Sequence, residues 1–345
     1  MAFARFGGSD TQKEQWSVLL DRVLDWSFVG LVFLIPIFFL PLTTEALELN
    51  KQMLLFIGAL WLGLVFTTRI VVTGHIEMKR SPLYWGFLAM LAAWILATVF
   101  SLYSYNSIIG LERQEFVSLA SIIALLVVTF IMGNAGTART ARRSICALLV
   151  SAALVSLVGL LHTFGVSLFP WDFTKTRAFT PVGLFTLWGA LSTVTLVLAV
   201  NEIIRLSLSD SAKKGLHTIL LALFAVIQLL VLLMLDNSTL WIALTAGLVV
   251  SLVVLYLKLP QDQKVSWLIL PCFLVVLSIT MTIVNPPRFA TLPIVAMPSL
   301  QTSADITVAT LKDHPAFGVG PGNFLATFTK NRPADLNNVS LLGLW

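Results

Sequence analysis

A glycine- and proline-rich stretch late in the chain holds the residues whose types and spacing could most directly do chemistry. It reads DHPAFGVGPGNF from Asp313 to Phe324. Three glycines and two prolines within eight residues predict a rigid, sharply turning loop, and the backbone N–H groups of such a loop can hold an anion. The glycines follow a GxGxG pattern with no strand before them, so the loop by itself is more typical of a structural turn. The candidate residues of this loop are Asp313, Pro315, Gly318, Gly320, Gly322 and Asn323.

Four cations beside apolar segments form a second group. Arg113 stands just before one long apolar run, Lys175 and Arg177 stand just before another, and Arg288 lies in a proline-rich stretch after the last run. Their functional interpretation is a clamp on an anionic lipid head group such as a pyrophosphate, because the planar guanidinium fork binds phosphate oxygens in pairs. The alternative is that each cation reaches lipid phosphates or pairs with a nearby acid, namely Glu112, Glu115 or Asp172.

The other side chains that could take part in chemistry are better explained by structural roles. The aromatic residues beside Lys175 are typical of an interfacial belt. The four histidines are scattered; His314 adjoins the glycine loop and is a candidate general base, although packing or hydrogen bonding in the loop is its favoured role. The two cysteines lie in apolar runs as small fillers. No metal and no cofactor is predicted. The aromatic residues are Phe169, Trp171 and Phe173, and the cysteines are Cys146 and Cys272.

The composition places these residues in a membrane protein. Of the 345 residues, 57% are hydrophobic and only 11% are charged, less than half of the roughly 25% usual in soluble proteins. This excludes a pair of soluble domains, a disordered chain, a collagen, a disulfide-stapled secreted domain and a nucleic-acid-binding domain. The net charge of +5 is small for this length, so the positions of the charges matter more than their sum.

Apolar runs of about 20 residues, the length that crosses a bilayer core, predict an all-α integral membrane protein. Transmembrane strands are excluded because the runs do not alternate in polarity. The polar first 22 residues do not resemble a cleavable signal peptide, so the first run is expected to be a retained helix. The nine runs are 23–42, 52–68, 83–102, 115–132, 144–163, 181–204, 216–235, 239–257 and 266–284.

The distribution of Lys and Arg predicts the orientation. With the N-terminus in the cytoplasm, the inner segments carry fourteen of the 22 cations, the short outer loops carry four, and the C-terminal stretch carries the last four. Residues 1–284 are therefore expected to form a helical bundle, and residues 285–345 an outer segment in the periplasm. A short helix capped near Ser303 and ending before Pro315 is expected in that segment.

The loop 313–324, after a short helix and outside a late span, resembles the motif of the bacterial O-antigen ligase and O-antigen polymerase superfamily. That pattern is close to D-x-P-hydrophobic-x-G-hydrophobic-G-x-G-x-aromatic. Four further segments are family-like: Glu48, Asn50 and Lys51; VTGHIEMKRSPL (72–83); IIGLERQEF (108–116); and TRAFTPVGLF, in which Arg177 would be the family's arginine.

The resemblance implies an all-helical enzyme of the bacterial inner membrane. Such an enzyme moves a glycan from an undecaprenyl-pyrophosphate carrier to a lipid, sugar or protein hydroxyl at the outer face, without a nucleotide sugar or a metal. Arg113, Lys175, Arg177 and Arg288 would hold the departing pyrophosphate, and a general base would activate the acceptor. The glycan, the acceptor, the oligomeric state and the choice between ligase and polymerase are not specified by the sequence.

Departures from the pattern keep other functions open. The family's Ser-Arg pair is replaced by Asp236-Asn237-Ser238-Thr239, its Asn-Pro-Asn is missing near 181–187, and no residue matches its downstream catalytic histidine. We expect either a fragment that lacks later spans or a protein without the catalytic part. The alternatives are a non-catalytic glycolipid-binding membrane protein and a lipid-linked oligosaccharide transporter, although the spans carry almost no cations for a transport cavity.

Overall fold

The structure, a computed structural model, describes residues 10–41, 46–74, 79, 81–110, 115–177, 179–208, 214–235, 237–258, 268–284 and 300–331. Within these residues every regular element is a helix, which confirms the all-α class. Each of the nine predicted runs overlaps a long helix of the described residues, although the bounds differ, most of all for α1: α1 (Asp10–Ile37), α2 (Glu48–Thr73), α3 (Leu83–Val99), α5 (Leu119–Ala135), α6 (Ala138–Thr163), α7 (Phe185–Ser207), α8 (Lys214–Leu235), α9 (Ser238–Lys258) and α10 (Ile269–Val284).

Shorter helices lie between or after the long ones. α4 (Ser104–Ile109) and the 3₁₀ turns η1 (Glu115–Val117) and η2 (Asp172–Thr174) belong to connecting segments. α11 (Leu300–Asp313) and α12 (Phe324–Asn331) flank the glycine–proline loop. α11 ends before Pro315 as predicted, but it begins earlier than the predicted cap at Ser303.

The helices are those of a membrane protein. α2, α6, α7, α9 and the Gly215–Leu235 part of α8 are long and apolar enough to cross a bilayer. α3, α5 and α10 are also apolar but only 16 or 17 residues long. At 1.5 Å per residue these three reach about 25 Å, slightly less than a hydrocarbon core of roughly 30 Å.

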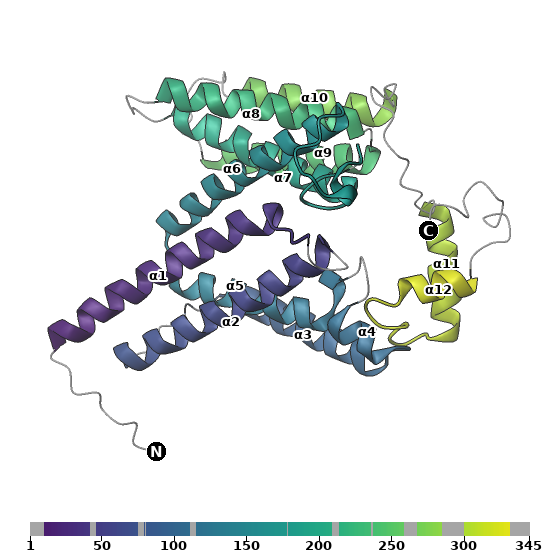
Figure 1. Cartoon of the computed structure of the whole chain (residues 1–345), viewed down its shortest axis with the longest axis horizontal. Coiled ribbons are helices and arrows are strands. Elements are labelled where there is room, and N and C mark those ends of the chain that lie inside the picture. Colours follow the sequence, from purple (N-terminus) through teal and green to yellow (C-terminus); the bar gives the residue numbers. More distant parts are fainter. Residues whose placement is uncertain are drawn as a thin grey trace, which may run out of the picture. The chain divides into compact units, whose positions relative to one another are not determined.

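The chain forms two compact units. The first comprises Met1–Leu31, Leu42–Ala141 and Ile294–Trp345, and the second comprises Val32–Pro41 and Arg142–Pro293. In Figure 1 the yellow helices α11 and α12 lie beside α4, within the first unit. The predicted boundary at residue 284 divides a bundle in the membrane from a segment outside it. It concerns the surroundings of the chain and not its contacts, so it stays a prediction.

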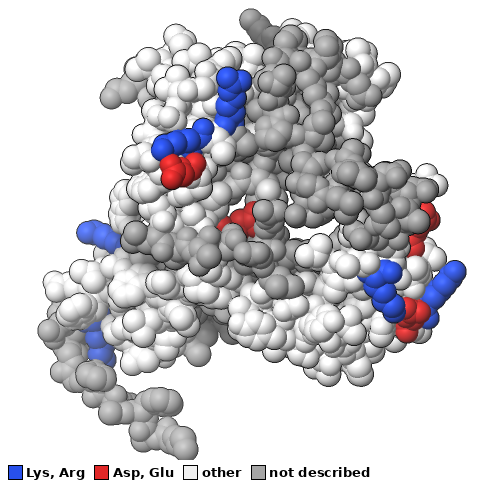
Figure 2. Space-filling view, turned by 45° about the vertical axis from the view of Figure 1, so that its right-hand side comes forward, with Lys and Arg blue, Asp and Glu red and all other residues white. Residues whose placement is uncertain are grey.

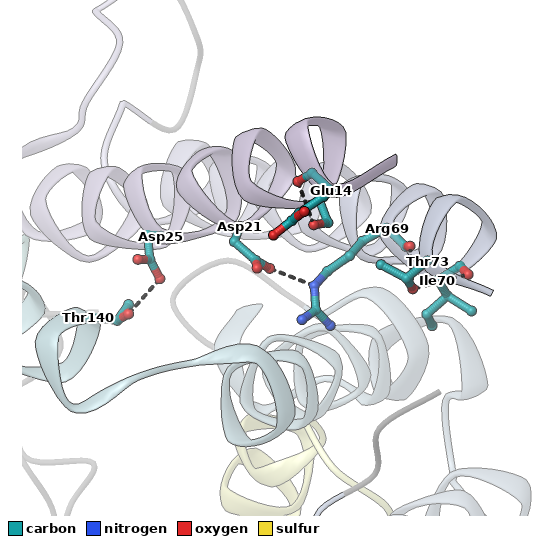
Figure 3. Close-up of polar contacts among 8 residues, drawn as sticks. Glu14, Asp21, Asp25, Arg69, Ile70, Thr73 and Thr140 are labelled. Carbon is teal, nitrogen blue, oxygen red and sulfur yellow. Dashed lines mark hydrogen bonds and ion pairs between the residues drawn. The ribbon is translucent and has the colours of Figure 1, made fainter. Parts of the chain in front are cut away.

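Polar contacts join α1 to other segments of the first unit, as Figure 3 shows. Arg69 of α2 donates to Asp21 of α1 over 2.5 Å. Thr140, in the first turn of α6, donates to Asp25 of α1. Thr137 precedes that turn, and its hydroxyl accepts from the Thr140 N–H over 3.1 Å, which caps the helix. These contacts hold the middle of α1 against α2 and the start of α6.

Small residues and a buried polar group organise the second unit. A Cβ added at Gly159 of α6 would lie 2.8 Å from the Trp188 ring, and one added at Gly189 of α7 would collide with Leu240. Helices in membranes approach each other through such small residues. The Trp188 Nε1–H donates to Ser156 over 3.2 Å, and Ser156 donates to Gln228 over 3.1 Å. α6, α7 and α8 are thereby joined inside an apolar core.

The outward surfaces of the long helices are apolar. Exposed large hydrophobic side chains include Trp85, Val99, Ile219, Val250 and Ile283. On the face seen in Figure 2, the coloured charged side chains are few, and several lie in small groups of opposite charge between uncharged residues. Lipid, whose chains are as apolar as leucine, suits such a surface.

Candidate functional site

The glycine–proline loop folds closely against the corner between α3 and α4. Gly318, Gly320 and Gly322 have φ angles of 62°, 85° and 74°, in the left-handed region that favours glycine. A Cβ at Gly320 would lie 2.5 Å from the Cβ of Ser101 and 2.9 Å from the carbonyl oxygen of Ala97. The loop therefore requires glycine there both for its backbone conformation and for the close approach of the α3 end.

Hydrogen bonds fix the loop in this position. The Leu102 N–H donates to the Val319 carbonyl over 3.0 Å. Ser107 in α4 donates its hydroxyl to the Pro321 carbonyl over 2.7 Å. The rings of Phe100 and Phe317 stack with centroids 4.6 Å apart. Both backbone and side-chain contacts thus tie the motif to residues 100–107.

Asn323 lies at the centre of this contact. Its side chain is 1% exposed. Its amide N–H groups point to the hydroxyls of Ser101 and Ser107, at 2.8 and 3.0 Å, and to the Val319 carbonyl at 2.8 Å. Its Oδ1 atom has no hydrogen-bond partner among the described residues. The motif asparagine therefore acts first as an anchor for its own loop.

A second buried amide lies on the other side of α4. Gln52, in the first turn of α2, is fully buried, and its Nε2 donates to the Ile109 carbonyl over 2.7 Å. The same nitrogen reaches the hydroxyls of Ser118 and Ser121, at 3.2 and 3.0 Å. Since Ser107 and Ile109 both belong to α4, this helix joins the two amides. We call Gln52, Ser101, Ser107, Ser118, Ser121 and Asn323 the amide–hydroxyl cluster.

Opposite charges are buried at the α2 side of this cluster. Glu48 and Lys51 occupy the first turn of α2 and are 8% and 3% exposed. They are three residues apart, so they lie on one face of the helix, and the Glu48 carboxylate attracts the Lys51 ammonium. Because both side chains are buried, this pair belongs to the interior of the first unit and offers little surface to a ligand.

The charged residues of the motif itself lie at the surface. Asp313 accepts from the Lys330 ammonium over 2.9 Å, and this hydrogen bond keeps the pKa of Asp313 below its usual value. Both side chains are at least half exposed. His314 and Pro315 are exposed too, and no hydrogen bond joins the His314 ring to the described part of the chain. In the described part of the chain, no residue orients the His314 ring for its predicted role as a general base.

The four predicted pyrophosphate ligands divide into two pairs. Arg113 and Arg288 lie outside the described residues. In the sequence, Arg113 falls between Ile109 and Ser118, which both accept from Gln52. Lys175 and Arg177 lie in the second unit, whereas the motif loop belongs to the first.

Lys175 and Arg177 are exposed on the loop between α6 and α7. Lys175 donates to Asp172 over 2.6 Å, as the alternative interpretation of the cation predicted. That hydrogen bond lowers the pKa of the Asp172 carboxyl below its ordinary value. Arg177 makes no ion pair with the described residues, so its guanidinium is open to an anion.

An aromatic cluster lies beneath these cations. His162 at the end of α6 is 2% exposed, and its ring centroid lies 5.0 Å from that of Phe179. Phe39 packs edge-on against both Phe169 and Phe179, at 5.3 and 5.6 Å. Trp171 also joins this cluster. The aromatic residues predicted to form an interfacial belt therefore also pack into a cluster around a buried histidine.

Sequence reasoning missed Gln52, Ser101, Ser107 and Ser118. A usable signal was present, because polar residues at the very ends of long apolar runs must satisfy their hydrogen bonds somewhere. The pairing of Ser101 and Ser107 with residues more than 200 positions away, and of Gln52 with Ser118, could not be read from spacing.

Comparisons with known proteins add no relative to this description. No protein-family model, no curated protein and no solved structure matches the chain. The function must therefore be argued from the residues of this chain.

Proposed function

We propose that this membrane protein transfers a glycan from a polyprenyl-pyrophosphate carrier to a hydroxyl acceptor at the outer face of the bacterial inner membrane. The observation that carries the proposal is the amide–hydroxyl cluster. It joins the neighbourhoods of three segments that resemble the O-antigen ligase and polymerase superfamily and are far apart in sequence: the start of α2, residues 108–116 and the loop 313–324. A turn of purely local function would not need such partners.

The hydrogen bonds of the first unit agree with the sides of the membrane that we propose for the ends of its helices, while the cytoplasmic N-terminus itself rests on the distribution of Lys and Arg. Asp21–Arg69, Asp25–Thr140 and Lys79–Asn134 each join two segments predicted to lie inside. Gln52–Ile109 and Ser107–Pro321 each join two segments predicted to lie outside. None of these five pairs joins a predicted inner segment to a predicted outer one, and the motif loop belongs with the outer set.

The proposed reaction is a displacement at the first sugar carbon of the donor. The acceptor hydroxyl attacks this carbon, a new glycosidic C–O bond forms, and the bond from the carbon to the pyrophosphate oxygen breaks. The pyrophosphate leaves with the bonding electrons, and the acceptor proton passes to a general base. Arg113, Lys175, Arg177 and Arg288 stabilise the negative charge on the leaving group.

A second candidate is a glycolipid-binding protein without transferase activity. The exposed position of His314 and the lack of a described hydrogen bond that would orient its ring favour it. A base with no orienting partner is a poor catalyst. The two candidates share the donor-binding surface and differ only in bond breaking.

The test uses the full chain in lipid nanodiscs with a polyprenyl-pyrophosphate-linked disaccharide as probe. Arg113→Ala and Arg177→Ala should each abolish glycan transfer and weaken donor binding, while expression is kept. Arg205→Ala is the matched control, since Arg205 is an exposed arginine that pairs with Glu202 on a segment predicted to lie inside. Normal transfer in both test variants would reject the clamp. Donor binding by the unmodified chain without release of polyprenyl pyrophosphate would favour the binding protein.

A further inference from the structure

We propose that Phe169, Trp171 and Phe173, here called the aromatic shelf, stack against the first sugar ring of the donor while the neighbouring cations hold its phosphate. The inference rests on the proposed function in taking a sugar diphosphate as the ligand. It adds a site for the sugar, which none of the predicted ligands supplied.

The shelf is built by alternate residues of the α6–α7 loop, the last of which, Phe173, lies in the 3₁₀ turn η2. Phe169 and Trp171 have ring centroids 5.8 Å apart and planes inclined by 22°. Trp171 and Phe173 have centroids 6.3 Å apart and planes inclined by 18°. Each ring is thus nearly parallel to the next one along the chain. The aromatic shelf therefore consists of consecutive rings with similar orientations.

One side of the aromatic shelf is covered by other rings and the other side is open. Phe39 stands edge-on to Phe169 and Trp171, and Phe179 stands edge-on to Phe169 and Phe173. The rings of Phe39 and Phe179 also touch each other, so both back the same side. Trp171 and Phe173 are nevertheless each 38% exposed. The exposed area must therefore belong largely to the side away from these two rings.

The shelf is held in place before any ligand binds. Thr174 is fully buried and donates to the carbonyl oxygens of Trp171, over 2.7 Å, and Phe169, over 3.3 Å. The Leu168 N–H reaches the ring of buried His162 over 3.4 Å. Rigid aromatic contacts cost little conformational entropy on binding.

The charges around the shelf suit a sugar phosphate. Asp172, between Trp171 and Phe173 in the sequence, has a side chain that is 96% exposed and accepts from Lys175. A carboxylate accepts hydrogen bonds from sugar hydroxyls, and the faces of aromatic rings attract the polarised C–H groups of a pyranose. Arg177, without an ion pair in the described part of the chain, supplies the partner for phosphate. A plain interfacial belt would place the Asp172 carboxylate among lipid phosphates, which repel it.

The experiment compares two probes on the full chain in nanodiscs of neutral lipid: polyprenyl pyrophosphate bearing N-acetylglucosamine, and bare polyprenyl pyrophosphate. The unmodified chain should bind the sugar-bearing probe about fivefold more tightly, the effect of one good aromatic contact. Trp171→Leu should remove this difference and leave the affinity for the bare probe unchanged, and Trp171→Tyr should restore part of it. Trp85→Leu, at a 76% exposed tryptophan on α3, is the control.

Each outcome has one meaning. If Trp171→Leu weakened the binding of both probes equally, or left the preference for the sugar-bearing probe unchanged, the proposed sugar site would be wrong. Trp171 would then be an interfacial anchor only. A sugar preference that Trp171→Leu abolishes, in a chain that transfers nothing, would refute the proposed transfer and keep the shelf. Binding of neither probe by the unmodified chain would overturn both.

Discussion

The glycine–proline loop of the first unit and the α6–α7 loop of the second unit are both candidate binding segments, but different forces build them. The first is held by amide and hydroxyl hydrogen bonds and by glycines that let two backbones approach. The second is held by ring packing around His162, with its charged residues at the surface.

This difference determines where each segment can tolerate change. In the first, polar atoms are buried and the volume near Gly320 is filled, so small additions of volume or charge should disrupt it. In the second, packed aromatic rings make up most of the buried part and the charged side chains are exposed, so charge changes should alter binding and leave the fold intact. The comparison predicts opposite sensitivities, which the following substitutions test in order of expected effect.

Phe179→Ala should give the largest loss of stability. Phe179 is 4% exposed and contacts Phe39, His162, Phe169 and Phe173. Deleting a buried Phe ring costs about 3–5 kcal/mol. The melting temperature of the detergent-solubilised chain measures the effect. Phe164→Ala, at an 80% exposed ring of the same loop, should change it little. Equal shifts would mean that the rings do not form a core.

Gly320→Ala should come next, with a cost of about 2–4 kcal/mol. The cost combines a left-handed conformation for a residue with a Cβ and a collision with Ser101 and the Ala97 carbonyl. Limited proteolysis and hydrogen exchange of residues 300–331 report whether the segment detaches. Gly318→Ala is the matched control, because Gly318 has a φ of +62° but no atom within 4 Å of the added Cβ. An equal loss of stability in Gly318→Ala would show that the left-handed backbone conformation alone, and not the close approach to Ser101, requires glycine in this loop.

Asn323→Ala should cost about 2 kcal/mol, since it removes an amide that bonds two serines and a carbonyl and leaves buried groups unpaired. Asn323→Asp should be at least as disruptive because a carboxylate cannot donate to the Val319 carbonyl. Thermal unfolding measures both variants, with Asn331→Asp as the control at a partly exposed position. A neutral Asn323→Asp variant would contradict the anchoring role.

The smallest effect is expected at the exposed ion pairs, where the two segments should behave alike. Lys175 lowers the pKa of Asp172, and Lys330 lowers the pKa of Asp313, each below the ordinary 3.8. A depressed folded-state pKa stabilises the fold above the unfolded pKa, and this contribution is lost as pH falls through the folded pKa. Carboxyl NMR titration should place both midpoints below 3.8, and Lys175→Met should raise only that of Asp172. An unmoved Asp172 midpoint would show that the pair is not formed in solution.

The sequence by itself determined the helical class, the membrane environment and the nine apolar runs that became helices. Hydrophobicity and length act locally along the chain, so no knowledge of partners was needed. The glycine content of 313–324 likewise predicted a tight turn, because φ preferences belong to single residues.

Only the tertiary structure decided which surfaces these elements share. It paired Asn323 with Ser101 and Ser107, joined Gln52 to the segment before α5, and gave the predicted aromatic belt a buried histidine at its centre. These contacts join residues that lie far apart along the chain, and spacing carries no information about them. Which buried amide meets which hydroxyl depends on the packing of whole helices, because a polar group in an apolar interior must take the partner that packing brings within reach.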